Sequence, residues 1–137
     1  MLAEYSYIRF HAYMNISQDS MSDILTGFSD LTRLRILFLL QNSRVSVNCL
    51  VSALELPQPT VSRHLCSLRR SGMIESEKHG TTKLYQPVRN SPNSELIKNI
   101  ITEYHIHWME QEPFFSDRTR LKHIGKKCPA GCEVARV

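Results

Sequence analysis

Residues 58–75 read QPTVSRHLCSLRRSGMIE, and this stretch decides the fold. Three apolar residues recur in it at helical spacing: Val61, Leu65 and Leu68. They predict an amphipathic helix over 59–70. Ser71-Gly72 marks its end, because glycine adopts the left-handed conformation that closes a helix. The opposite side of the helix carries hydroxyl and arginine side chains, which suit contacts to phosphates and bases.

The segments on either side of this helix complete a recognisable arrangement. Residues 47–54 carry an apolar stripe of their own and predict a helix that ends before a short turn at 55–58. After the quoted stretch the period changes, and residues 73–77 and 83–88 predict two strands joined by a hairpin tip at 78–82. Helix, short turn, helix and hairpin together predict a winged helix-turn-helix.

Helices are also expected at both ends of this unit. Residues 21–28 predict a first helix capped by Ser20 or Ser22, and residues 31–41 predict a central one capped by Asp30. Residues 94–112 predict a long helix whose apolar edge exceeds what a small domain must cover. We expect that edge to pair two copies of the chain, the alternative being that it packs on its own domain.

The expected fold class is therefore mainly α with a small β-hairpin, in one winged helix-turn-helix domain. The chain has 137 residues, a length that favours a single domain. We assign residues 1–20 to an N-terminal extension and 21–112 to DNA binding and dimerisation. Residues 113–137 are expected to be a basic, cysteine-containing C-terminal tail without clear periodicity.

Composition narrows the class of function. The longest apolar run, 36–40, is far too short to cross a bilayer, so we expect no membrane association and a cytoplasmic protein. In that compartment the 4 cysteines are expected as thiols, metal ligands or redox groups. No glycine-rich phosphate loop, catalytic triad or carboxylate pair stands out, so an enzyme is not expected. The net charge of +4 favours a polyanionic partner.

The helix over 59–70 and the following hairpin predict a surface for double-stranded DNA. Short polar groups at the start of the helix can reach base edges, while basic side chains contact the sugar–phosphate backbone. The candidate DNA-binding residues are Gln58, Thr60, Ser62, Arg63, His64, Arg70, Lys78, His79 and Lys83. Two alternatives remain open, a solvated basic face and a winged helix that binds protein instead of DNA.

Two longer stretches resemble a known family. FSDLTRLRILFLL (28–40) and LVSALELPQPTVSRHLCSLRRSGMIESEKHGTTKLYQ (50–86) are similar to the ArsR/SmtB family of bacterial metal- and stress-responsive transcriptional repressors. Leu31 stands where the family usually has a proline. The resemblance implies a homodimer, built from the first and last helices, that binds a palindromic operator and releases it when an inducer binds.

The family's own arsenic site is not present in its usual form. Family members that sense arsenic carry cysteines at positions that correspond here to Ser46, Asn48 and Val51. Cys49 is one residue away from this pattern.

The C-terminal tail offers a different pair of thiols, Cys128 and Cys132, beside two lysines that favour the thiolate form. We expect this pair to bind a thiophilic ion such as As(III) or Sb(III) as inducer, with no ion required for folding. The third ligand is left open between Cys49, His123 and a cysteine of the other subunit. The alternatives are that the same two thiols sense oxidation, or that the tail is disordered and its cysteines incidental.

Overall fold

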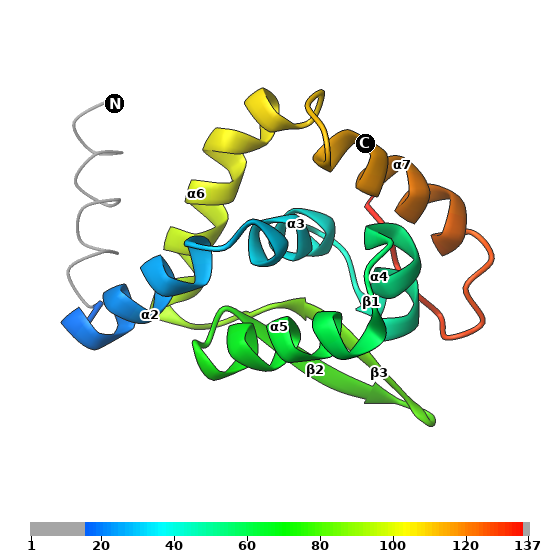
Figure 1. Cartoon of the computed structure of the whole chain (residues 1–137). Helices are drawn as coiled ribbons and strands as arrows, with labels where there is room; N and C mark the ends of the chain where they lie inside the picture. The colour runs from blue at the N-terminus through cyan, green and yellow to red at the C-terminus, as the bar shows by residue number, and fades with distance from the viewer. Residues whose placement is uncertain (1–15, 136–137) are drawn as a thin grey trace, which may run out of the picture.

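The computed structural model describes residues 16–135 (Figure 1). Within them, helices pack against a small antiparallel sheet that lies along the lower edge of the view in Figure 1 and has the strand order β1-β3-β2. Most of the expected N-terminal extension lies outside the described residues. The elements in chain order are α2 (Gln18–Phe28), α3 (Leu31–Leu40), β1 (Val45–Ser46), α4 (Val47–Leu54), α5 (Gln58–Arg70), β2 (Ile74–His79), β3 (Thr82–Pro87), α6 (Pro92–Trp108) and α7 (Phe114–Gly125).

The first two helices, α2 and α3, each begin after a residue whose side chain caps the helix start. Asp30 caps α3, as expected, by accepting a hydrogen bond of 2.9 Å from the Arg33 backbone N–H. Ser17, and not Ser20 or Ser22, caps α2, because its hydroxyl accepts the Ser20 backbone N–H at 3.1 Å and starts the helix earlier. α3 is buried over much of its surface and forms the centre of the domain.

The helix-turn-helix consists of α4 and α5, as the pattern predicted. Glu55 ends α4 in the left-handed conformation, with φ of 53°. On α5 the predicted stripe is confirmed, since Val61, Leu65 and Leu68 are all buried in the core. The polar side of α5 is thereby held outward.

The wing, which we define as β2, β3 and the turn between them, is a hairpin with Lys78 paired to Lys83. Its turn is only Gly80-Thr81, shorter than expected, and Gly80 supplies the positive φ of 64° that a tight turn requires. The sequence did not indicate β1, a two-residue strand that pairs with β3. The fold class is confirmed, with a third short strand added to the hairpin.

The long helix α6 serves two surfaces. Ile97 and Ile101 are buried against the domain, whereas Tyr104 and Ile106 are exposed. The helix ends at Trp108, earlier than expected, and Trp108 stacks on Phe114 with ring centroids 5.4 Å apart. One part of its apolar surface therefore packs on the chain's own domain and another part does not.

Among residues 16–135, none of the helices has the length and the apolar character that spanning a membrane would require.

The segment expected as a basic tail without periodicity instead contains a helix, α7, that packs along α4 (Figure 1). Leu121 and Asp117 are both buried. The Asp117 carboxylate receives hydrogen bonds of 2.7–2.8 Å from Arg35 and Arg120. Both arginines also donate to backbone carbonyls at the end of α4. The helix escaped a search for apolar periodicity because its buried face includes this ion-paired carboxylate.

Residues 126–135, which we call the C-terminal arm, return from α7 to the sheet. Glu133 and Arg44 exchange two backbone hydrogen bonds of 2.7 and 2.9 Å, an antiparallel bridge beside β1. The Ala135 N–H donates to the Ser43 hydroxyl at 3.0 Å. The arm is thus seated on the domain at the edge of the sheet.

Candidate functional site

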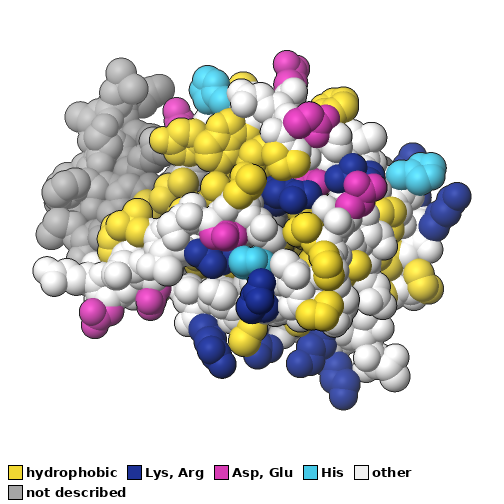
Figure 2. Space-filling model, in the orientation of Figure 1, with side chains coloured by type: hydrophobic (Ala, Val, Ile, Leu, Met, Phe, Trp, Pro, Cys, Tyr) yellow, Lys and Arg dark blue, Asp and Glu magenta, His cyan; other side chains and the backbone are white. Residues whose placement is uncertain are grey.

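A basic surface covers α5 and the wing. We use the name basic face for the exposed side chains Arg63, Arg69, Arg70, Lys78, His79 and Lys83. Figure 2 shows lysine and arginine side chains along the lower edge of the molecule, where α5 and the wing lie. Helix and hairpin therefore present their cations on one side of the protein.

The wing holds two of these cations in direct opposition. Lys78 and Lys83 are cross-strand partners near the hairpin tip, and both are exposed. Like charges in this position destabilise a hairpin unless an anion lies between or beside them. A phosphate backbone would relieve that repulsion.

The start of α5 offers polar side chains and few free backbone N–H groups. Pro57 occupies the cap position without a side-chain hydrogen bond, Pro59 has no N–H, and the Thr60 N–H donates to the Pro57 carbonyl at 3.0 Å. Gln58, Thr60 and Ser62 lie near this end of the helix, and the Gln58 amide donates to the Ser62 hydroxyl at 2.9 Å.

His64 is placed differently from the other candidate DNA-binding residues. Its side chain is only 14% exposed, and its Nδ1 lies 3.7 Å from the Asp30 carboxylate at the start of α3. Although burial opposes it, the hydrogen bond from Arg33 and the charge of His64 lower the pKa of Asp30 overall. His64 therefore faces α3, because its position on α5 points toward the core and not toward the basic face.

Three thiols meet on the other side of the domain. The sulfur of Cys128 lies 2.9 Å from that of Cys49 and 2.8 Å from that of Cys132, and Cys49 and Cys132 are 3.5 Å apart. We call these three residues the thiol cluster. Among the described residues, it is the one group of three or more potential ligand side chains found close enough to hold one metal ion. Of the third ligands left open by the sequence, the structure brings Cys49 to the pair.

The cluster is assembled from two elements and held by a third residue. Cys49 comes from the first turn of α4, while the other two cysteines come from the C-terminal arm. Ser46, which is 1% exposed, caps α4 through its hydroxyl, which accepts the Cys49 backbone N–H at 3.3 Å. The Ser46 backbone N–H donates to the Cys132 sulfur, also at 3.3 Å. Sequence reasoning named Ser46 only as a position where the family's arsenic site has a cysteine, and its contact with Cys132 was missed because nothing in the chain indicates that the arm returns to this point.

Cys49 and Cys128 differ in acidity. Burial raises the pKa of Cys49 to about 12. Burial also acts to raise the pKa of Cys128, but hydrogen bonds from the Cys132 and Cys49 thiols outweigh it and lower that pKa to about 7. The Cys128 thiol therefore ionises near neutral pH, and its thiolate is the form that binds metals and reacts with electrophiles.

A cleft of about 470 Å³ opens beside the cluster and reaches Cys49 and Cys128. Lys127 and His123 line it, so an incoming group meets positive charge near the thiolate. His123 lines the cleft but is not part of the thiol cluster. A small ion or oxidant thus has a route from solvent to the sulfurs.

Three sulfurs suit some ions better than others. Soft thiolate ligands select thiophilic ions over Mg²⁺ and Ca²⁺, which prefer oxygen. Zinc in structural sites takes four ligands, and the cluster provides three. A trivalent metalloid that forms three bonds matches the number of sulfurs.

Comparisons with known proteins agree with the winged helix-turn-helix of this chain. The model of the family described as "Bacterial regulatory protein, arsR family" matches residues 30–76, which span α3 to β2. An uncharacterized HTH-type transcriptional regulator of Methanocaldococcus jannaschii is 38% identical over 68 residues, which cover 49% of this chain and 76% of that protein.

Further matches include both a transcriptional repressor and a transcriptional activator. The HTH-type transcriptional repressor SmtB of Mycobacterium tuberculosis is 35% identical over 68 residues, half the length of each chain. The solved structure of HlyU from Vibrio cholerae superposes with a TM-score of 0.59 and 30% identity, and the match covers 66% of this chain and 94% of that one. HlyU is described as a transcriptional activator. The matched proteins are transcriptional regulators and not enzymes.

Proposed function

The chain belongs to the ArsR family of bacterial regulatory proteins, and from this premise we propose that it is a homodimeric repressor released from its operator by a trivalent metalloid bound at the thiol cluster. DNA binding and transcriptional regulation follow from the family. The contacting residues, the dimer, the sign of regulation and the inducer are our proposals. The observation that carries the inducer is the meeting of Cys49, Cys128 and Cys132.

DNA recognition is proposed to use α5 and the wing. Arg63 is exposed on the polar side of α5, where it can pair with a guanine edge or a phosphate. Lys78 and Lys83 would contact the backbone beside the groove, because they stand on the hairpin next to this helix. His64, which faces Asp30, would position α5 without touching DNA.

Arg63→Ala tests this assignment. We expect a loss of about 1–3 kcal/mol in operator binding, measured by fluorescence anisotropy with the chain's own upstream DNA. Lys98→Ala is the matched control, since Lys98 is an exposed cation on α6, away from the basic face. Equal affinities for the two variants would refute the assignment. A steep decrease of affinity with salt would separate DNA binding from a winged helix that binds protein.

The dimer is proposed to form through α2 and α6. Large apolar side chains of these helices remain exposed in the single chain, among them Leu25, at 59%, and Ile106, at 78%. Figure 2 shows hydrophobic side chains gathered over this part of the molecule. Two-fold pairing would bury such surfaces. It would also place the α5 helices of the two subunits so that each enters the major groove at one of two adjacent half-sites of the operator. Ile106→Glu should yield monomers in analytical ultracentrifugation, and a dimer unaffected by this change would refute the interface.

The inducer is proposed to be As(III) or Sb(III). Cys128 supplies a thiol that ionises near neutral pH. Each arsenic–sulfur bond would replace an arsenic–oxygen bond of arsenite, and the displaced hydroxyl groups would take up the thiol protons and leave as water. Arsenite added to the DNA complex should lower operator affinity at least about tenfold. The double variant Cys128→Ser/Cys132→Ser should bind DNA normally and no longer respond. Release that persists in this variant would refute the site, while cadmium and zinc serve as comparison ions.

Oxidation of the same thiols is a second candidate, favoured by the 2.8 Å contact between Cys128 and Cys132. The Cys128 thiolate would attack a peroxide to give a sulfenic acid, and the Cys132 thiol would then displace water to form a disulfide. A protein that loses two hydrogens and DNA affinity with peroxide, but ignores arsenite, would establish this function in place of the first.

A further inference from the structure

The C-terminal arm touches both the thiol cluster and a residue that contacts the wing. Cys132 lies in the cluster, and the next residue, Glu133, pairs with the Arg44 backbone through two hydrogen bonds. The Arg44 guanidinium in turn donates to the Glu77 carboxylate at 2.6 Å. Glu77 belongs to β2 of the wing. Four residues thus connect the sulfurs to the hairpin.

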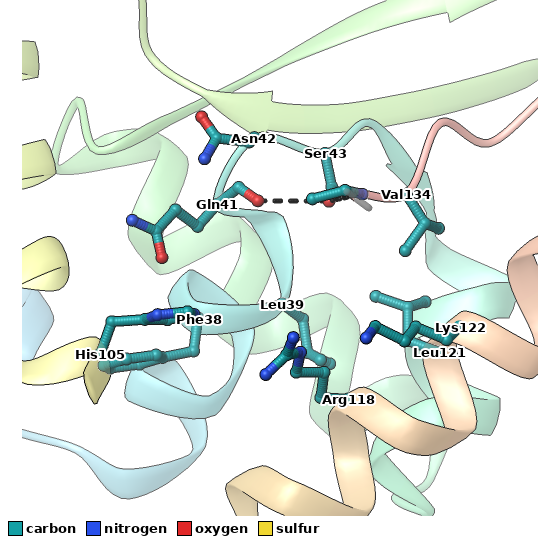
Figure 3. Close-up of a pocket in the computed structure, with 11 residues that line it drawn as sticks. Phe38, Leu39, Gln41, Asn42, Ser43, His105, Arg118, Leu121, Lys122 and Val134 are labelled. Atoms are coloured by element: carbon teal, nitrogen blue, oxygen red, sulfur yellow. Dashed lines mark hydrogen bonds between the residues drawn. The ribbon is translucent and has the colours of Figure 1, made fainter. Parts of the chain in front are cut away.

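The middle of the arm is held by contacts on two sides. Ser43 is buried, and its hydroxyl accepts the Ala135 N–H of the arm. Val134 packs against Gly125 of α7, where an added Cβ would lie 2.5 Å from a Val134 methyl carbon. Figure 3 shows Val134 between α7 and the turn that carries Ser43. These contacts tie the arm to β1 and α7, while the cavity of about 160 Å³ beside it, lined by Ser43, Val134 and Ala135 among others, leaves it room to shift (Figure 3).

A second contact joins the cluster to the sheet itself. Ser46 donates its N–H to Cys132, and in β1 it is paired with Leu84 of β3. Leu84 is the cross-strand partner of Glu77. Both routes from the cluster, through Arg44 and through Ser46, consequently reach the same position of the wing.

An ion must disturb this arrangement in order to bind. A trivalent metalloid bonded to three sulfurs is pyramidal, and with bonds of about 2.3 Å at angles of about 95–100° two ligand sulfurs lie about 3.4–3.5 Å apart. The sulfur of Cys128 is 2.9 Å from Cys49 and 2.8 Å from Cys132, so both separations must grow. Cys49 is fixed in α4, which leaves the arm as the part that shifts.

We propose that the C-terminal arm is the mechanical link between the thiol cluster and the wing. Spreading of the sulfurs moves Glu133 and, with it, Arg44. The ion pair between the Arg44 guanidinium and the Glu77 carboxylate changes as a result. This inference rests on the proposed inducer site. The ion shifts DNA affinity by favouring a second position of the wing, because a packed interface of this kind adopts discrete arrangements.

Glu77→Gln tests the link, with Glu75→Gln as its matched control. Both remove one negative charge from the same face of β2, but the Glu75 carboxylate contacts Gln86 and not Arg44. Arsenite binding is followed by the sulfur-to-arsenic absorption band, and operator affinity is measured with and without arsenite. We expect both variants to bind arsenite. The ratio of operator affinity without arsenite to operator affinity with arsenite should be at least about fivefold smaller in Glu77→Gln than in the wild-type protein. In Glu75→Gln this ratio should keep the wild-type value.

A second pair of variants tests the link without any ion. Glu133→Pro removes the N–H that donates to Arg44, whereas Glu133→Ala keeps it. Hydrogen exchange of residues 74–87 should accelerate in Glu133→Pro alone.

The outcomes separate the two proposals. If wild-type protein ignores arsenite while Glu133→Pro still loosens the wing, the inducer fails and the link stands. If arsenite releases wild-type DNA but Glu77→Gln responds as wild type, or if Glu133→Pro leaves exchange in the wing unchanged, the link is overturned.

Discussion

Two surfaces of this protein are built in opposite ways. The basic face comes from one stretch of chain, α5 and the wing, and its side chains point outward. The thiol cluster joins Cys49 to Cys128 and Cys132, which follow it in the chain by 79 and 83 positions. The Cys49 side of the cluster is buried, since this residue is 5% exposed. DNA contacts need only an exposed scaffold, whereas a soft-ion site needs several sulfurs to converge.

The difference has an energetic side. Like charges face each other on the basic face, as in the cross-strand pair Lys78–Lys83, and such an arrangement would be stabilised by an anionic partner outside the chain. The thiol cluster relies on partners inside the chain, since α7 and the arm must dock before the sulfurs can meet. Changes in α7 should therefore affect the cluster more strongly than they affect DNA binding.

The largest effect is expected from Asp117→Ala. Removing this buried carboxylate leaves Arg35 and Arg120 without their shared partner, and breaking a buried ion pair costs about 3–5 kcal/mol. Urea unfolding measures the change. Asp23→Ala, on the exposed side of α2, is the control and should cost less than about 0.5 kcal/mol. A similar, small cost for both variants would mean that α7 does not support the domain.

A smaller effect is expected from Ser46→Ala, which removes the cap of α4. Loss of an N-cap costs about 1 kcal/mol. Ser17→Ala removes the equivalent cap of α2 and should cost a similar amount. Only Ser46→Ala should weaken arsenite binding, because Ser46 holds the backbone of Cys49. Equal arsenite affinity in the two variants would show that Ser46 stabilises the helix without positioning the cluster.

The smallest change concerns the reactivity of Cys128. Its pKa is lowered from 9.0 to about 7, so the thiolate is present above neutral pH and is lost as pH falls through that value. Alkylation of Cys128 by iodoacetamide should reach half its maximal rate near pH 7, as read by peptide mass spectrometry. In urea-unfolded protein the half-maximal rate should move to the ordinary range of a thiol, about 8.5. A midpoint in that range for the folded protein would contradict the hydrogen-bonded cluster.

The DNA-binding half could be read from the sequence because its elements carry local signals. Val61, Leu65 and Leu68 gave the buried face of α5, and Ser71-Gly72 gave its end. The helix-turn-helix and the hairpin followed in the correct order. Only the two-residue strand β1 was missed there, since two residues are too few to show an alternating pattern.

The thiol cluster could be read only in part. Cys128 and Cys132 stood out as a spaced pair, but their third partner depends on α7, whose buried Asp117 interrupts any apolar stripe. His64 was assigned to the DNA surface from its chemistry, although its position on the helix turns it toward Asp30. Long-range ion pairs and backbone bridges, such as Arg44 with Glu133, leave no local pattern.

Arsenic X-ray absorption on arsenite-loaded protein examines the thiol cluster itself. We expect wild-type protein and Cys66→Ser to show three sulfur neighbours around arsenic, because Cys66 lies on α5 outside the cluster. Cys49→Ser should show two sulfurs and one oxygen. Arsenic bound to oxygen in the wild-type protein, or three sulfurs retained in Cys49→Ser, would contradict a site built from α4 and the C-terminal arm.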